Sequence, residues 1–130
     1  MTDATAEDRR RNGRQLYTEM FDAERLRRQD ASRNDFNGPL RDYVMETCFG
    51  NIWDRPGLER KTRSLLCIAM LTALRLPNET RSHVNSALNN GCTVDELREA
   101  IMHTAPYCGL PATGQTMAVA EEVLRERALL

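Results

Sequence analysis

The stretch LERKTRSLLCIAMLTALRL, residues 58–76, contains the longest run of apolar side chains in this sequence. From residue 65 onward the apolar residues cover nearly every direction of a helix, which predicts a central, buried helix. Because a chain of 130 residues has difficulty surrounding a helix completely, we expect another subunit to cover part of it. The run is about half the roughly 20 residues that a membrane span needs, and it contains Thr72 and Arg75. We therefore expect no segment that crosses a bilayer.

The residues before this helix predict two further regions. The turn WDRPG at residues 53–57 precedes it, because proline and glycine interrupt helices. A helix is expected from Leu40 to about Asn51, with one face formed by apolar residues four apart. These are Leu40, Val44 and Cys48. Residues 30–39 are rich in turn-forming types, and residues 7–28 carry few apolar side chains, which predicts polar surface helices that add little to the core.

The residues after it predict a short helix from Pro77 to Asn89, which Gly91 ends as a left-handed residue. Thr93 and Glu96 have the spacing of a capping box and mark the start of the next helix. Its buried stripe is expected at helical spacing. The stripe consists of Val94, Leu97, Ile101 and Thr104 with Ala105.

Two prolines define the C-terminal end of this pattern. Pro106 is expected to bend or end its helix before Tyr107, and Pro111 to open a last helix. The inner face of the last helix is predicted to consist of Met117, Ala120, Val123 and Leu124. Strand-like alternation is absent, so we expect an all-α bundle of about six helices. Residues 1–130 would form a single domain, with a polar N-terminal segment at 1–34 and a core at 35–125.

Composition excludes several classes of protein. Eighteen basic residues face nineteen acidic ones, a net charge of -1, so a nucleic-acid or anionic-membrane binder is not expected. The N-terminus lacks the apolar core of a secretory signal, and the four cysteines contain no CxxC pair. We interpret them as reduced packing residues in a cytoplasmic protein, in preference to disulfides or metal ligands. They are Cys48, Cys67, Cys92 and Cys108.

Several short motifs, in a fixed order, resemble the carboxymuconolactone decarboxylase family over about residues 35–123. They are FGNIWDRPGL at 49–58, TRSL at 62–65, IAML at 68–71, ExRxH at 79–83, NNGCT at 89–93 followed by Asp95 and Glu96, His103, and YxGLPA at 107–112. Phe49, where a tryptophan is expected, and Pro106, in place of a helix-compatible residue, depart from the pattern of the family's dedicated protocatechuate enzymes.

The resemblance implies an all-helical fold of the alkylhydroperoxidase D-like superfamily, assembled as trimers or hexamers with sites near subunit contacts. Peroxidase relatives carry a CxxCxxxH motif, and alignment on His83 places Leu76 and Glu79 at the two cysteine positions. Thiol chemistry is therefore not expected there. Ser64 stands where those relatives carry an acidic residue.

The implied reaction is decarboxylation of 4-carboxymuconolactone to 3-oxoadipate enol-lactone, in protocatechuate breakdown by the β-ketoadipate pathway. No cofactor is expected, because electrons left by CO2 run through the C=C bond into the lactone carbonyl. The protein must stabilise the resulting dienolate and protonate carbon.

The resemblance and the helical spacing together select the site residues. Glu79 and His83, at i and i+4, share one helix face, so the carboxylate would orient the imidazole that protonates or holds the dienolate. The alternative interpretation is that Glu79 and His83 are an ordinary solvent-exposed pair on the helix without a catalytic role. His103 is either a second acid or hydrogen-bond donor to the oxyanion, or a hydrogen-bonded histidine at a helix or subunit boundary. Tyr107 either donates a hydrogen bond to the substrate or packs at the bend expected at Pro106.

The substrate carries two carboxylates, which arginine binds in bidentate fashion. Arg55 and Arg63 are the preferred candidates, whereas Arg81 points away from His83 on its helix. Trp53 is expected either to wall the pocket or to pack in the core.

Three other functions remain open at this stage. The chain would be a family enzyme for another lactone or unsaturated acid, a non-catalytic oligomeric binding or assembly protein, or a thiol peroxidase using Cys92 or Cys108.

Overall fold

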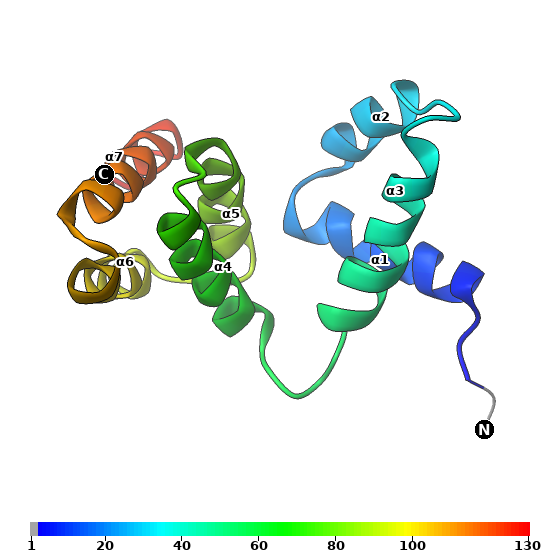
Figure 1. The fold of residues 1–130 in the computed structure, drawn as a ribbon, viewed down its shortest axis with the longest axis horizontal. Coiled ribbons are helices and arrows are strands. Elements are labelled where there is room, and N and C mark those ends of the chain that lie inside the picture. The colour runs from blue at the N-terminus through cyan, green and yellow to red at the C-terminus, as the bar shows by residue number, and fades with distance from the viewer. Residues whose placement is uncertain (1–2) are drawn as a thin grey trace. The chain divides into compact units, whose positions relative to one another are not determined.

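The computed structural model describes residues 3–130, which form helices and contain no strand (Figure 1). The elements are α1 (Ala6–Met20), α2 (Ala23–Ala31), α3 (Gly38–Tyr43), the π-helix η1 (Val44–Ile52), α4 (Arg60–Leu74), α5 (Pro77–Asn89), α6 (Val94–Cys108) and α7 (Leu110–Glu126). The predicted all-α class is confirmed. The chain divides into two compact units, unit 1 (Met1–Leu58) and unit 2 (Glu59–Leu130).

Unit 1 is built on a close contact between α1 and η1. A Cβ atom on Gly13 would lie 1.9 Å from the Met45 carbonyl oxygen, and one on Gly50 would lie 2.0 Å from that of Arg9. The two helices therefore pack backbone against backbone, which only glycine permits at these positions.

This contact corrects the expectation that the N-terminal helices add little to the core. The buried apolar side chains of unit 1 come from both partners and from the turn that follows. They are Leu16, Tyr17, Met20, Met45, Phe49 and Trp53. The boundary between the two compact units falls after Leu58. The expected polar character holds for α2, which has no buried residue.

The prediction that Leu40, Val44 and Cys48 form the inner face of the helix at 40–51 is wrong. Leu40 is 66% exposed, and the fully buried side chains are instead Met45 and Phe49. The physical reason is the π-helix, whose i to i−5 hydrogen bonding widens each turn and rotates the buried face. At its end the Trp53 N–H donates to the Cys48 carbonyl oxygen at 2.9 Å.

Unit 2 has α4 at its centre, as predicted, in contact with α5, α6 and α7. Its buried core has one continuous apolar cluster, and the helices also share two buried hydroxyl pairs. The cluster is Ile68, Val84, Ala87, Cys92, Leu97, Ile101, Ala120, Val123 and Leu124. Thr72 bonds Thr116 at 2.8 Å between the Oγ1 atoms, and Thr104 bonds Thr113 at 2.8 Å. These pairs satisfy polar groups that would otherwise be costly to bury.

The predicted helix ends in unit 2 are largely confirmed. Gly91 has a φ of +96°, and the side chain of Thr93 and that of Glu96 each accept the other residue's backbone N–H at 3.0 Å. Pro106 does not end α6, which runs on to Cys108. Because Pro106 lies in the last turn, its missing N–H costs only one helical hydrogen bond before Gly109, at φ +92°, ends the helix.

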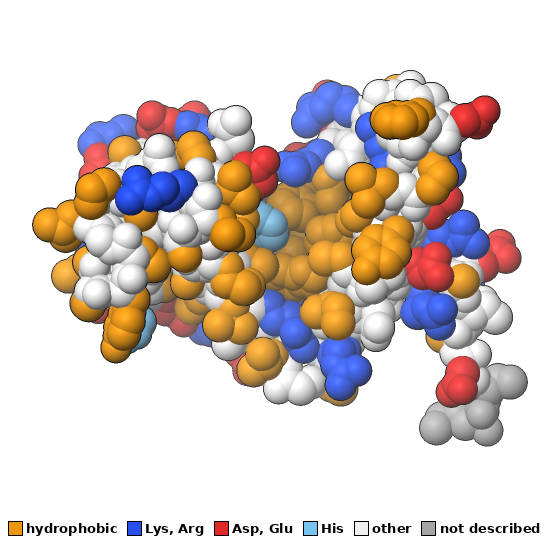
Figure 2. Space-filling model, in the orientation of Figure 1, with side chains coloured by type: hydrophobic (Ala, Val, Ile, Leu, Met, Phe, Trp, Pro, Cys, Tyr) orange, Lys and Arg blue, Asp and Glu red, His pale blue; other side chains and the backbone are white. Residues whose placement is uncertain are grey.

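The central helix is not fully covered. Leu66, Met70 and Leu74 on α4 are 47%, 57% and 66% exposed, and their spacing of four residues aligns them along one stripe. Figure 2 shows hydrophobic side chains over α4. We call these three residues the α4 stripe. Within the described residues, none of the helices has the length and apolar character required to cross a membrane.

Candidate active site

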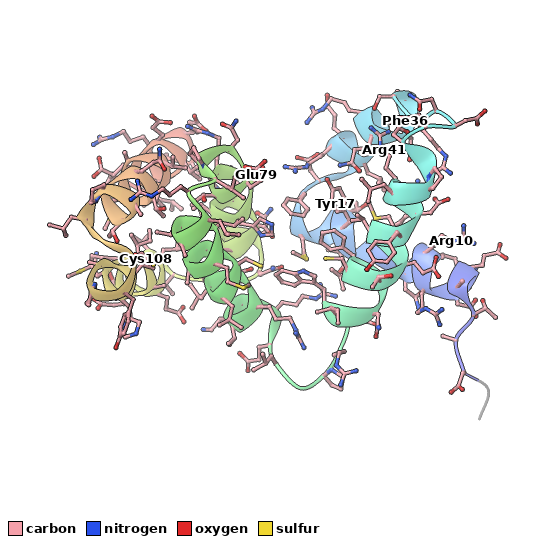
Figure 3. All side chains as sticks on the ribbon, viewed as in Figure 1. Arg10, Tyr17, Phe36, Arg41, Glu79 and Cys108 are labelled. Atoms are coloured by element: carbon pink, nitrogen blue, oxygen red, sulfur yellow. The ribbon has the colours of Figure 1, made fainter. Side chains whose placement is uncertain are left out.

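The candidate catalytic pair lies on α5, which is anchored by buried Thr80, Val84 and Ala87. Glu79 and His83 each precede one of these anchors, so both side chains project beside the buried stripe on one helix face. His83 is half-buried, with its Nδ1 atom buried, whereas Glu79 is exposed (Figure 3). The structure therefore presents a partly desolvated imidazole with a carboxylate one turn away.

Arg63 belongs to the neighbouring helix α4, which runs antiparallel to α5. Asn90 donates from Nδ2 to the Oγ atom of buried Ser64 at 2.9 Å. This hydrogen bond places the end of α5 beside the start of α4. His83 lies seven residues before Asn90 and Arg63 lies one residue before Ser64, so the two backbones are about 12 Å apart along the helix axis. Arg63 is half-buried and its Nε atom is buried, so its side chain is partly removed from solvent.

Arg81 points away from His83, as predicted. It donates to Glu122 and lies 3.5 Å from Glu126, both on α7. This arginine therefore links α5 to α7 at the surface and is not available for a substrate carboxylate.

His103 and Tyr107 form a second, separate pair on α6. Their ring centroids are 5.5 Å apart, and both side chains are exposed, Tyr107 at 80%. The buried stripe of α6 is formed by Leu97, Ile101 and Thr104, so His103 projects from a different face of the helix. The two pale-blue histidine side chains appear at separate places in Figure 2.

Trp53 and Arg55 belong to unit 1. Trp53 is 6% exposed, and its ring stacks on that of Phe49, with centroids 6.4 Å apart and an 18° interplanar angle. The packing interpretation of this tryptophan is thereby supported. Arg55 is exposed in the turn after η1, where its N–H donates to the Ile52 carbonyl oxygen at 3.3 Å.

The four cysteines are free thiols. Burial, and next the charge of Glu96, raise the pKa of the Cys92 thiol, and burial raises the pKa of Cys48. The Cys92 Sγ atom donates to the Lys61 carbonyl oxygen at 3.4 Å. Because peroxide reduction needs a thiolate, the buried, hydrogen-bonded environment of Cys92 does not favour its use as a peroxidase thiol.

One polar group near the pair escaped the sequence interpretation. Ser86 follows His83 by three residues on α5 and is fully buried, and its Oγ atom has no hydrogen-bond partner in the part of the chain that the structure describes. A serine in a polar helix gives no signal in sequence, because only the packing of α5 decides that this hydroxyl is buried.

The arrangement on α5 is suited to proton transfer. An imidazole that is partly removed from water can hold or donate a proton at a substrate atom, and a carboxylate one helical turn away can orient it. The half-buried guanidinium of Arg63 adds a positive charge on the adjacent helix.

Comparison with known proteins identifies the family of this chain. The model of the carboxymuconolactone decarboxylase family matches residues 39–122. The 4-carboxymuconolactone decarboxylase of Acinetobacter baylyi is 41% identical over 120 residues, covering 92% of this chain and 90% of that protein. The nitrosuccinic acid decarboxylase of Metarhizium robertsii is 37% identical over 100 residues, covering 75% of this chain and 70% of that protein. The chain belongs to the carboxymuconolactone decarboxylase family.

Proposed function

We propose that this protein is a cofactor-independent decarboxylase that converts 4-carboxymuconolactone to 3-oxoadipate enol-lactone and CO2. The observation that carries the proposal is the half-buried imidazole of His83 beside Glu79 on α5. The 41% identity to a 4-carboxymuconolactone decarboxylase supports the choice of substrate. We place the protein in the cytoplasm, a choice that its four free cysteines support.

The reaction needs few groups from the protein. The bond between the ring carbon and its carboxylate breaks, CO2 leaves, and the electron pair moves through the C=C bond onto the lactone carbonyl oxygen. The dienolate then takes one proton at carbon, which restores the lactone carbonyl. The butenolide is its own electron acceptor, so the protein supplies charge stabilisation at oxygen and a proton.

Each candidate residue has a role in this scheme. His83 delivers the proton or donates a hydrogen bond to the dienolate oxygen, and Glu79 positions the imidazole. Arg63 and Arg55 are proposed to bind the carboxylates, of which one leaves and one stays. His103 and Tyr107 are a second donor pair, used if substrate also contacts the exposed face of α6.

A second candidate function follows from the other named relative. Its printed name gives nitrosuccinic acid as substrate, an open-chain acid in place of a lactone. Loss of CO2 from either compound leaves an electron pair that a neighbouring group must accept, so one proton donor would serve both. The alternative is therefore a decarboxylase for a different lactone or unsaturated acid. A non-catalytic binding protein would need neither His83 nor Glu79.

The experiment that tests the proposal supplies 4-carboxymuconolactone generated enzymatically in place and follows CO2 release and enol-lactone formation. A panel containing nitrosuccinate, other lactones and unsaturated acids is run in parallel. Rapid turnover of the lactone alone supports the first function, and turnover of another acid alone supports the second. Absence of turnover on every compound by the intact protein contradicts both.

Glu79 is expected to act through His83, so its replacement tests positioning. Glu79→Gln keeps the size of the side chain and removes the charge that favours a protonated imidazole. We expect kcat to fall and its pH dependence to move toward lower pH. Measurement of kcat across pH 5–9 for wild type and variant checks this. An unaltered pH profile would contradict the assigned role.

We also propose that the chain assembles as a homo-oligomer, a trimer or hexamer, through the α4 stripe. Three exposed apolar side chains in line on the central helix of unit 2 are the surface that supports this. Met70→Glu places a charge in that stripe and is expected to release monomers. Size-exclusion chromatography with light scattering measures the mass. Met102→Glu is the matched control, because Met102 on α6 is exposed to a similar extent, 54%. A wild-type monomer, or an intact Met70→Glu oligomer, would exclude this interface.

A further inference from the structure

A pocket of about 40 Å³ lies within unit 1, and none of the residues assigned to the reaction above lines it. Four arginines and two aspartates line it, together with Gln29 and the apolar side chains of Leu26 and Met45. The charged residues are Arg10, Arg14, Arg33, Arg41, Asp30 and Asp42. Its lining therefore carries a net charge of +2, from four positive and two negative side chains. We call it the arginine pocket.

Two of the arginines are neutralised by the aspartates. Arg14 donates to both carboxylate oxygens of Asp30 at 2.9 and 2.7 Å, and Arg33 donates to both oxygens of Asp42 at 2.8 and 2.9 Å. Each is a bidentate pair, the strongest common geometry for these groups. The side-chain hydrogen bonds hold the pKa of both aspartates below the usual range, so both stay charged near neutral pH.

The other two arginines make no bidentate pair with a carboxylate. Arg41 donates to the Gln29 carbonyl oxygen and, at 3.0 Å, to the Ser32 hydroxyl, both of which are uncharged acceptors. The guanidinium of Arg10 lies 3.7 Å from Asp42 and 3.8 Å from Glu46, distances too long for direct hydrogen bonds. Because a guanidinium has five N–H groups, both side chains retain donors for a further acceptor.

We propose that the arginine pocket binds one small oxyanion, held by Arg10 of α1 and Arg41 of α3. The shared chemistry is a charged group with two or three oxygens, either a carboxylate or a phosphate, which guanidinium groups recognise. The volume of the pocket limits the size of the anion that it can hold. One water molecule needs about 10–15 Å³, and the pocket offers only a few times this volume. A bound anion would link α1 to α3 and so stabilise unit 1.

The test is isothermal titration of the full-length protein with inorganic phosphate and, separately, with acetate. Ionic strength is kept constant with sodium chloride, since added salt also screens the surface ion pairs. Amide shifts in ¹⁵N NMR spectra locate the binding. We expect saturable binding of one anion per chain, with shifts confined to residues of unit 1 around the pocket, in α1, α2, α3, the segment between α2 and α3, and the start of η1. The ratio of the two affinities identifies whether the site prefers phosphate or carboxylate.

Two variants make the result decisive. Arg10→Gln removes one surplus guanidinium without breaking a direct hydrogen bond, and should weaken anion binding by about tenfold or more. Arg11→Gln is the matched control: the neighbouring arginine on α1 is 67% exposed, pairs with Asp8 and does not line the pocket. Its affinity for the anion should stay within twofold of wild type. Equal weakening in both variants, or failure of phosphate and acetate alike to bind saturably, would overturn the proposal.

Discussion

Replacement of His83 by alanine is expected to lower the turnover of 4-carboxymuconolactone by about 10²–10⁴-fold, the usual contribution of a positioned general acid. The imidazole is the half-buried acid–base group on α5, and alanine leaves neither a proton nor a hydrogen-bond donor there. If the group acts in the transition state, kcat and kcat/KM should fall by similar factors. CO2 release and enol-lactone formation, measured on the same samples, give both constants.

Two controls separate catalysis from folding in this experiment. Asn78→Ala changes an exposed side chain in the first turn of the same helix and should retain wild-type turnover. His103→Ala removes the exposed histidine of α6 and reports whether the second pair takes part. Unchanged turnover in His83→Ala would refute the role of this residue, while wild-type activity on the lactone would still support the reaction itself.

Replacement of Gly50 by alanine is expected to destabilise unit 1 by about 3 kcal/mol or more. The added Cβ would lie 2.0 Å from the Arg9 carbonyl oxygen and 2.7 Å from that of Met45, and both obstacles are backbone atoms. The helices α1 and η1 must therefore separate, which also opens the aromatic packing of Tyr17 against Phe49, whose ring centroids are 5.0 Å apart. Gly13→Ala should act the same way, because its Cβ would meet the Met45 carbonyl oxygen at 1.9 Å.

Urea unfolding followed by tryptophan fluorescence measures this effect directly. Trp53 is the single tryptophan of the chain and is buried in unit 1, so its emission reports that unit. Gly114→Ala is the matched control, since Gly114 is also helical but has open space around its Cβ position. Because Gly114 lies in unit 2, we expect the unfolding of unit 1 that Trp53 reports to stay at the wild-type urea concentration in that variant. If Gly50→Ala unfolds at the wild-type urea concentration, the close backbone contact is wrong.

The helices of unit 2 were predicted well because their signals are local. Proline at the start of α5 and α7, the Thr93–Glu96 capping box and the left-handed Gly91 each act within a few residues. Unit 1 was predicted poorly for the opposite reason. The i to i−5 bonding of η1 changes which side chains face inward, and no propensity in residues 44–52 reveals it.

The same distinction between local and tertiary signals applies to the candidate site. Spacing alone put Glu79 and His83 on one face of α5 and turned Arg81 away from them, because the helical period fixes both relations. Spacing did not show that His103 and Tyr107 would be exposed, or that the hydroxyl of Ser86 would be buried. Those properties depend on which helices pack against α5 and α6.

The sequence by itself determined the all-α class, the central place of α4 and the position of Glu79 and His83 on one face of α5, since hydrophobic periodicity and helix caps act through near neighbours. Only the tertiary structure decided that Gly13 and Gly50 let α1 and η1 meet backbone to backbone. It also brought arginines from α1 and α3 into one pocket. These features join residues about 30 or more positions apart, and their geometry depends on how whole helices pack, which no short pattern along the chain encodes.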